Sequence, residues 1–469
     1  RQQKVRPQRA LRLQMQLRQK RSNFMKILFI SLGCDKNLAD SEEMLGLLTA
    51  GGHEITDDET QADAIVINTC CFIKDAKEES VETILEMAEY KKTGSCHALI
   101  VTGCMAQRYQ KEIIEEVPEV DAVLGTTSYG DIVKALEEAV AGNHFEEFRD
   151  IDYLPDTGSK RVLTTGGHFG YLKIAEGCDK HCTYCIIPKL RGKFRSVPME
   201  RLIAQVEDMA EQGVKELILV AQETTVYGKD LYGKKSLHIL LKKLCEIRGI
   251  RWIRILYCYP EEIYDELIET IRDEKKICHY LDIPIQHASD RILKRMGRRT
   301  SKQELIDIVG KLRKEIPDIV LRTTLITGFP GETEEDHEEL KEFVDEMEFD
   351  RLGVFTYSPE ENTPAAEMAD QVPEEVKEER RDELMELQQE ISYDRGQDRI
   401  GQELLVMIEG KVADESAYIG RTYGDAPKVD GYIFVQTGEL LMTGDFAKVR
   451  VTGALEYDLI GVLSDEYTE

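Results

Sequence analysis

Six short apolar segments alternate with helical segments between Tyr171 and Tyr357, and this repetition limits the fold more than any other feature. Residues 201–211 show the helical pattern most clearly, because Leu202, Val206 and Met209 fall on one face. Strand–helix repeats of this kind form parallel sheets with right-handed crossovers. Six units cannot close the eight-stranded barrel, so we expect an open (β/α)6 partial barrel. Its expected strands are 171–175, 216–221, 252–256, 280–283, 320–325 and 352–355.

Three cysteines follow the first of these strands at the spacing C-x3-C-x2-C, namely Cys178, Cys182 and Cys185. Parallel barrels carry their chemistry at this carboxyl end of the strands. Three neighbouring thiolates can hold three corners of a cubane iron–sulfur cluster. No fourth cysteine lies nearby, so one iron would remain open to an outside ligand. A zinc knuckle is the alternative, and it requires a fourth ligand, for which His181 is a candidate.

A second set of three cysteines is distributed over residues 25–142, which read as a parallel α/β domain. Its expected strands are 27–30, 64–68, 98–102 and 122–124, and its expected helices are 41–50, 74–90, 105–117 and 129–140. Cys34, Cys70 and Cys104 each follow a different strand, at the edge where such sheets bind ligands. They therefore indicate a second three-thiolate site, although small buried core cysteines are the alternative. Cys71 should point away from Cys70, because neighbouring side chains of an extended chain point in opposite directions.

Composition describes a globular protein without a membrane span: 42% of the 469 residues are hydrophobic, 32% are charged, and no apolar run approaches the length of a membrane helix. We therefore expect a cytoplasmic protein, in which eleven cysteines indicate metal or redox chemistry before disulfides. Four of them have no partners and are expected to be core thiols: Cys96, Cys245, Cys258 and Cys278. The formal net charge is −28, although residues 1–24 carry eight Lys or Arg and no acid. We read these 24 residues as a disordered tail or a start-site artefact.

Five segments follow one another along the chain. After the tail and the α/β domain, residues 143–170 read as a polar linker and residues 171–396 as the partial barrel, whose charged segment 373–396 is expected to be a helical strut. Residues 397–469 change to short strands with glycine-rich turns, which predicts a small antiparallel barrel. The position of this barrel resembles that of a TRAM domain, often an RNA-binding module. In this chain, residues 397–469 contain fourteen acids against six Lys or Arg. Such an acidic surface would bind RNA poorly and suits a basic protein.

The cysteine loop is similar to the signature of radical S-adenosylmethionine enzymes, C-x3-C-x-aromatic-C, with Tyr184 at the aromatic position. The flanking residues 173–177 and 186–192 resemble the methylthiotransferases of that superfamily. The resemblance implies two 4Fe–4S clusters, one on Cys178, Cys182 and Cys185 and an auxiliary one on Cys34, Cys70 and Cys104. It also implies that the open iron of the first cluster binds the amino and carboxylate groups of S-adenosylmethionine, which one electron then splits to a 5′-deoxyadenosyl radical.

The resemblance suggests cofactor contacts at other strand ends. Tyr184 belongs to the motif itself, and Gln222 and Glu223 follow the second strand. Glu223 could bind the cofactor's ammonium group, or it is an ordinary surface carboxylate. Gln286, after the fourth strand, can hydrogen-bond a ribose or the substrate. The neighbouring His287 shows no evident carboxylate partner in the sequence, which leaves a structural role as its alternative. Gly328, after the fifth, allows close backbone approach, as to an adenine ring.

The implied reaction inserts sulfur into an unactivated C–H bond, which has no proton that a general base could remove. Hydrogen abstraction by a carbon radical avoids this limit, and the substrate carbon must then meet a methylated sulfur at the auxiliary cluster. Residues 221–228 and 420–431 resemble the ribosomal-protein branch of the family, whose substrate is an aspartate of small ribosomal subunit protein twelve. A transfer-RNA adenosine methylthiotransferase is the alternative, and an iron–sulfur scaffold without turnover is a third possibility. A flavodoxin or ferredoxin is the expected electron donor, a separate sulfur source is required, and nucleic acid is not expected as the direct substrate.

Overall fold

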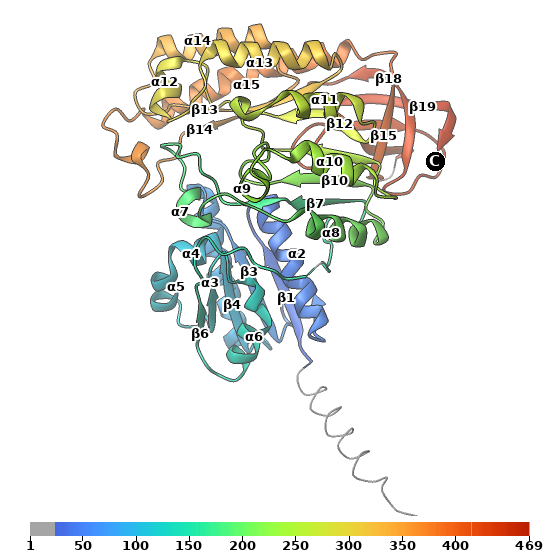
Figure 1. Ribbon diagram of the computed structural model, residues 1–469. Coiled ribbons are helices and arrows are strands. Elements are labelled where there is room, and N and C mark those ends of the chain that lie inside the picture. Colours follow the sequence, from blue (N-terminus) through green and yellow to red (C-terminus); the bar gives the residue numbers. More distant parts are fainter. Residues whose placement is uncertain (1–23, 159, 414, 469) are drawn as a thin grey trace, which may run out of the picture. The chain divides into compact units, whose positions relative to one another are not determined.

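The computed structural model describes residues 24–158, 160–413 and 415–468, and the chain divides into two units, Arg1–Val162 and Leu163–Glu469 (Figure 1). The tail expected over residues 1–24 lies outside the described residues apart from Phe24. Within the described ranges, no helix combines the length and the apolar character that crossing a membrane requires.

The first unit is built on a six-stranded parallel sheet in the order β2-β1-β3-β4-β5-β6. Strands β3 and β4 are buried along their whole length, as their continuous apolar runs predict for a sheet covered on both faces. The elements are β1 (Lys26–Ser31), α2 (Asp35–Ala50), β2 (Glu54–Thr56), β3 (Ala64–Thr69), α3 (Lys74–Thr93), β4 (Ala98–Gly103), α4 (Cys104–Arg108), α5 (Gln110–Glu116), β5 (Ala122–Leu124), the 3-10 turn η1 (Tyr129–Asp131), α6 (Ile132–Val140) and β6 (Phe145–Glu147).

Three local features of this unit differ from the sequence-based expectation. Helix α2 begins at Asp35, six residues before the expected residue 41. The helix expected over 105–117 is interrupted at Tyr109, which separates α4 from α5. The short edge strands β2 and β6 were not expected, and β6 lies inside the segment 143–170, which is therefore not wholly irregular linker.

The second unit contains the expected open parallel sheet of six strands, in the order β14-β13-β12-β11-β10-β7. The sheet carries charges, since Asp282 of β12 and Arg322 of β13 share one register position and form an ion pair of 2.9 Å. The strands are β7 (Phe169–Lys173), β10 (Glu216–Val220), β11 (Trp252–Ile255), β12 (Ile277–Asp282), β13 (Val320–Thr327) and β14 (Arg351–Thr356), and the intervening helices are α7 (Ile187–Arg191), α8 (Met199–Glu211), α9 (Lys229–Tyr232), α10 (Leu237–Cys245), α11 (Asp265–Asp273), α12 (Asp290–Arg295), α13 (Lys302–Glu315) and α14 (Glu334–Met347).

The charged segment 373–396, expected to be a helical strut, is the helix α15 (Glu374–Gln397), which contacts β18 of the last domain. The helix packs beside α14 and along β13 and β14, with polar side chains in the contact (Figure 1). Lys377 is buried and donates to the carbonyl of Tyr357, and Gln388 is fully buried and donates to the carbonyl of Phe349. Because these polar groups are satisfied by the neighbouring backbone, a helix with few apolar residues is able to pack.

The last five strands form a closed barrel in the order β15-β16-β17-β19-β18 around a buried apolar core. Four of its strand pairs are antiparallel, but β17 and β19 run parallel, so the expected purely antiparallel barrel is corrected at this one seam. The strands are β15 (Glu403–Lys411), β16 (Ala417–Thr422), β17 (Ile433–Gln436), β18 (Phe446–Ala454) and β19 (Leu459–Thr468).

Buried ion pairs join this barrel to the amino-terminal ends of the sheet strands. Arg421 lies 2.6 Å from Glu216, the first residue of β10, and Arg254 lies 2.8 Å from the same carboxylate. All three side chains are essentially inaccessible to solvent. The ring of Trp252 packs edge-on against Phe446 of β18, with ring centroids 4.8 Å apart. Residues 420–431, read above as a family feature, therefore include the contacts that dock the barrel on the sheet.

Candidate functional site

The cysteine loop lies beyond the carboxyl end of β7, and its two ends are brought together by a short antiparallel pair, β8 (Ala175–Glu176) with β9 (Arg195–Ser196). Gly177 opens the loop with φ +79°, and a Cβ at this position would lie 2.1 Å from the carbonyl oxygen of Lys193. Only glycine permits this close approach. The Cys178 amide then donates to the carbonyl of Gly192, which fixes the start of the loop against its end.

Ion pairs of Glu176 also hold the two ends of the cysteine loop together. Its carboxylate lies 2.8 Å from Lys173 Nζ and 3.2 Å from Arg191 Nη1, and it also accepts a hydrogen bond of 3.1 Å from the Gln222 amide. Burial alone would raise the pKa of Glu176, but Lys173 and Arg191 outweigh it and hold the pKa at about 2. The ionised carboxylate therefore links the strand before the cysteines, the helix after them and the loop after β10.

The thiols of this loop are shielded from water. Cys178 and Cys182 are buried and Cys185 is partly buried, while His181 is exposed, which does not favour it as a fourth ligand. Burial raises the pKa of the Cys178 and Cys185 thiols to about 12, so at neutral pH they become thiolates only when a metal displaces their protons. Over the described ranges, no three His, Cys, Asp or Glu side chains converge on one metal ion. A cubane has no such requirement, because each thiolate binds its own iron.

Two unpaired acceptor oxygens lie on the loop after β10. The Oε1 atom of Gln222 and the Oε2 atom of Glu223 are buried and have no hydrogen-bond partner. Glu223 is 1% exposed, and its other oxygen accepts from the Thr225 amide at 2.9 Å. Burial raises the pKa of Glu223 to about 7, against the lowering effects of Thr225 and Lys180. Because unpaired buried acceptors are costly, this pair fits a ligand that supplies donors, such as the ammonium and hydroxyl groups of S-adenosylmethionine.

Aromatic side chains and one guanidinium surround Cys182. The Tyr259 hydroxyl lies 3.6 Å from Cys182 Sγ, and the Tyr184 ring packs edge-on against Phe329 at 6.4 Å. Arg298 stacks over the Tyr259 ring at 4.3 Å and donates to the carbonyl of Pro284. Its Nε and Nη1 atoms are buried without a hydrogen-bond partner. A buried cation beside the cysteine loop suits a negatively charged cluster or a ligand carboxylate.

Strained backbone marks the neighbouring strand ends. Tyr257 after β11 and Gln286 after β12 adopt positive φ values of 59° and 72°, a conformation that non-glycine residues rarely occupy and that is concentrated at ligand sites. Gly328 after β13 also has a positive φ, of 68°, but a Cβ there would lie 2.0 Å from Lys377 of α15. The close approach at Gly328 is therefore explained by helix packing, and its proposed contact with an adenine ring stays a prediction.

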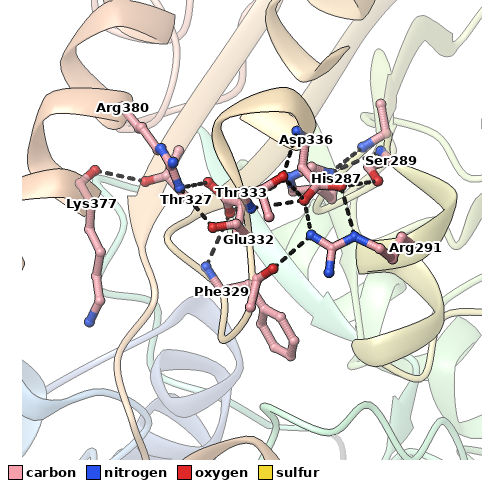
Figure 2. Close-up of polar contacts among 12 residues, drawn as sticks. His287, Ser289, Arg291, Thr327, Phe329, Glu332, Thr333, Asp336, Lys377 and Arg380 are labelled. Carbon is pink, nitrogen blue, oxygen red and sulfur yellow. Dashed lines mark hydrogen bonds and ion pairs between the residues drawn. The ribbon is translucent and has the colours of Figure 1, made fainter. Parts of the chain in front are cut away.

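His287 has a carboxylate neighbour that the sequence did not reveal. Figure 2 shows Glu332 between His287 and Arg380, at 3.6 Å from His287 Nε2 and 3.0 Å from Arg380 Nη1. The Nδ1 atom of His287 accepts from the amides of Ala288 and Ser289, which places the remaining proton on Nε2, toward Glu332. The histidine is fully buried and links two strand-end loops, one after β12 and one after β13.

The first unit brings the other three cysteines to one edge of its sheet. Cys34 precedes α2, Cys70 follows β3 and Cys104 begins α4, directly after β4. The strands that deliver them, β1, β3 and β4, are neighbours in the sheet. A Cβ at Gly33 would lie 2.8 Å from Cys70 Sγ, so the first two loops are in contact. Cys34 is exposed, whereas Cys70 and Cys104 are buried.

Cys71 lies close to this trio and is fully buried. Burial raises the pKa of its thiol, and the neighbouring Cys104 raises it further. The choice of Cys70 over Cys71 as a ligand therefore stays a prediction. Of the remaining thiols, Cys96, Cys258 and Cys278 are buried and Cys245 is partly buried, as expected for core cysteines.

Sequence reasoning missed Glu176 and Arg298 at the second-unit site. Glu176 is adjacent to the motif, and a charged residue in an otherwise apolar strand end was the available signal. Arg298 comes from the segment after α12, more than a hundred residues from the cysteines, and nothing in its local sequence separates it from neighbouring surface arginines.

Comparison with known families accounts for most of the chain. Residues 26–125 match the uncharacterized protein family UPF0004, residues 172–344 match the radical SAM superfamily, and residues 400–463 match the TRAM domain. Together with the open six-stranded sheet and its cysteine loop, these matches define the chain as a radical S-adenosylmethionine enzyme that carries a TRAM barrel.

Curated relatives identify the family within the radical S-adenosylmethionine enzymes to which this chain belongs. The chain is 66% identical over 437 residues to the ribosomal protein uS12 methylthiotransferase RimO of Lachnoclostridium phytofermentans, covering 93% of this chain and 99% of that protein. It is 51% identical to the RimO of Desulforamulus reducens, covering 93% and 98%. The chain belongs to the RimO family of radical S-adenosylmethionine methylthiotransferases, enzymes whose cofactors are S-adenosylmethionine and two 4Fe–4S clusters.

Solved structures agree on the fold. The radical S-adenosylmethionine methyltransferase TsrM of Kitasatospora setae, solved with cobalamin and a 4Fe–4S cluster bound, superposes with a TM-score of 0.54 at 14% identity, over 72% of this chain and 73% of that one. At this identity the likeness concerns the fold alone.

Proposed function

We propose that this enzyme transfers a methylthio group to the β-carbon of an aspartate in ribosomal protein uS12. The observation that carries the proposal is the 66% identity to a relative named as a ribosomal protein uS12 methylthiotransferase, across 99% of that protein's length. The charge of the barrel supports a basic protein substrate. Three of its acids are neutralised inside the molecule, where they pair with arginines or His168: Glu409, Asp425 and Asp430. Without these three acids and Arg421, residues 397–469 still contain eleven acids against five Lys or Arg.

The cluster ligands we propose are Cys178, Cys182 and Cys185 in the second unit and Cys34, Cys70 and Cys104 in the first. Each trio consists of soft donors. The motif of each trio supplies three cysteine ligands and not the four that would occupy every iron of a 4Fe–4S cluster. When bound, the clusters and S-adenosylmethionine supply one-electron reduction, a carbon radical and a site for the sulfur that is transferred. The chain's own contribution is to hold the thiolates in place and to keep water from Cys178 and Cys182.

We propose that residues around Cys178, Cys182 and Cys185 orient S-adenosylmethionine. We assign the ammonium group to Glu223, whose unpaired Oε2 is buried, and a donor group of the ligand to the unpaired Oε1 of Gln222. Glu176 orients the Gln222 amide, because it accepts from Nε2 and leaves Oε1 facing away. The free donors of Arg298 complement the ligand's carboxylate or the cluster's negative charge. Tyr184 and Gln286 complete the predicted contacts.

We further propose that the enzyme acts in the cytoplasm, where ribosomal proteins are present, and that a flavodoxin or ferredoxin supplies the electron. The sulfur comes from a separate donor, because no step assigned to this chain produces it. Nucleic acid is not proposed as a direct substrate, since the acidic barrel repels phosphates.

The test is mass spectrometry of uS12 from a strain that lacks the gene and from the same strain complemented with it. The methylthio mass shift should disappear on deletion and return with the wild-type gene but not with Cys104→Ala. An unchanged uS12 together with loss of a methylthio nucleoside from transfer RNA would favour the transfer-RNA enzyme instead. Failure of the reconstituted, reduced protein to form 5′-deoxyadenosine would favour a scaffold without turnover.

A further inference from the structure

Asn37 lies where the three cysteine loops of the first unit meet. Its Nδ2 atom donates to the carbonyl of Leu32, in the loop that carries Cys34, at 3.1 Å. The same atom donates to the carbonyl of Thr69, the residue before Cys70, at 3.0 Å. Its Oδ1 atom lies 3.9 Å from Cys104 Sγ. One fully buried side chain thus contacts the surroundings of all three cysteines.

We propose that Asn37 is a positioning residue for the auxiliary cluster, which fixes the separation of the three loops before any metal binds. The inference rests on the proposed ligation by Cys34, Cys70 and Cys104. An amide is suited to this role because its two N–H groups satisfy two carbonyls at once. Both donors are needed by carbonyls, so the orientation of the amide is fixed and Oδ1 must face Cys104.

A second set of buried polar contacts holds Asn37 itself. The Asn68 Nδ2 atom donates to the backbone carbonyl of Asn37 and to Ser41 Oγ, both at 2.9 Å. Ser41 Oγ in turn lies 2.8 Å from Ser31 Oγ at the end of β1. These contacts anchor the first turn of α2 to the ends of β1 and β3.

Ligand-orienting residues of this kind affect how strongly a protein retains its metal, and their loss typically costs 10–100-fold in affinity. Asn37→Ala removes both donors and the contact with Cys104. Asn37→Asp keeps the shape but removes the donors, and it places a negative charge beside a thiolate ligand. Asn37→Ser shortens the side chain without adding charge. Asn143→Ala is the matched control, because Asn143 is an exposed asparagine of the same unit that contacts Glu138.

The experiment uses the full chain with Cys178, Cys182 and Cys185 replaced by Ala, so that only the auxiliary cluster contributes iron. After anaerobic reconstitution, iron and sulfide content, the electron paramagnetic resonance of the reduced cluster and the rate of iron release to a chelator are measured. The unfolding temperature of the metal-free protein reports on folding. We expect Asn37→Ala and Asn37→Asp to release iron at least about 10-fold faster than the parent, with an altered resonance for Asn37→Asp. Asn143→Ala should match the parent.

Folded Asn37 variants that keep the parent's release rate and resonance would overturn the proposal. Unfolding of all three Asn37 variants would also overturn it, because Asn37 would then support the sheet as a whole. If the parent itself binds no iron, the cysteine assignment fails, and this outcome is distinct from a failure of Asn37 alone.

Discussion

Replacement of Arg421 by Ala should destabilise the second unit strongly. Its guanidinium is fully buried and lies 2.6 Å from Glu216, 2.6 Å from Glu409 and 3.0 Å from the Asp425 carbonyl. Removing one partner of a buried ion pair costs about 3–5 kcal/mol, because the remaining charge stays buried. Arg254 still neutralises part of the Glu216 charge, which keeps the expected loss within that range. Against a typical total of about 5–15 kcal/mol, this is a large fraction of the stability.

The single tryptophan of the chain provides the assay. Trp252 contacts Phe446 across the same junction, so its fluorescence reports on barrel docking while far-UV circular dichroism reports on the sheet and helices. Urea titrations of the full chain should show the free energy of unfolding lowered by about 3–5 kcal/mol in Arg421→Ala. Arg450→Ala removes an exposed arginine of the same barrel, paired with Glu403 at 3.1 Å, and should cost at most about 1 kcal/mol.

Acid provides a second check on the same arginine. Burial would raise the pKa of Glu216, but Arg421 and Arg254 outweigh it and hold the pKa below its ordinary value. The stabilising contribution is therefore present above about pH 4.3 and is lost as the pH falls through the lowered pKa. The difference in the free energy of unfolding between wild type and Arg421→Ala should therefore become smaller in that acidic range. Equal stability of the two proteins at neutral pH, or a comparable loss in Arg450→Ala, would refute the electrostatic explanation.

Three further predictions concern the two sites and one helix. Cys178→Ala should abolish 5′-deoxyadenosine formation, whereas Cys104→Ala should retain it and lose methylthiolation; equal loss of 5′-deoxyadenosine in both variants, measured by chromatography, would contradict separate roles. Glu223→Gln should weaken S-adenosylmethionine binding by roughly tenfold, as expected from loss of about 1.5 kcal/mol for a charged hydrogen bond, and calorimetry with the reconstituted protein checks it. Ser301→Ala should lower the free energy of unfolding by about 1 kcal/mol, because Ser301 forms a capping box with Glu304 at the start of α13; an unchanged urea midpoint would contradict this.

The sequence was sufficient for the parts of the fold that rest on apolar periodicity. Strands β3, β4 and β10 are buried along their whole length, and each was expected within one residue of its observed start. The edge strands β2 and β6 were missed because three-residue segments such as Phe145–Glu147 lack an apolar run. The parallel pairing of β17 with β19 was also missed, since strand direction within a small barrel depends on connections that local patterns do not encode.

The site was predictable to the extent that its residues belong to motifs. The first cysteine trio is predicted from its C-x3-C-x2-C spacing. The second is predicted from the places of its cysteines after three strands together with the family resemblance, which also suggests Glu223 after β10 as a cofactor contact; all of these assignments stay predictions. The residues that surround these cysteines could not be predicted in the same way, because they reach the cysteine loops from distant parts of the sequence. Asn37 reaches Thr69 across 32 positions, and Arg298 reaches the cysteine loop from beyond α12. Helix α15 shows the same limit, because the burial of Lys377 depends on a carbonyl twenty residues earlier in the chain.

The barrel is attached to the starting ends of the sheet strands, as the pairs of Arg421 with Glu216 and Asp425 with Arg351 show. The cysteine loop leaves β7 at the opposite end. Strands of five to eight residues at ~3.3 Å each separate the two by on the order of 15–25 Å. A partner anchored on the barrel must therefore span the length of the sheet to place a side chain at the cysteine loop. The docked barrel therefore sets a fixed distance between the surface that it presents and the cysteine loop.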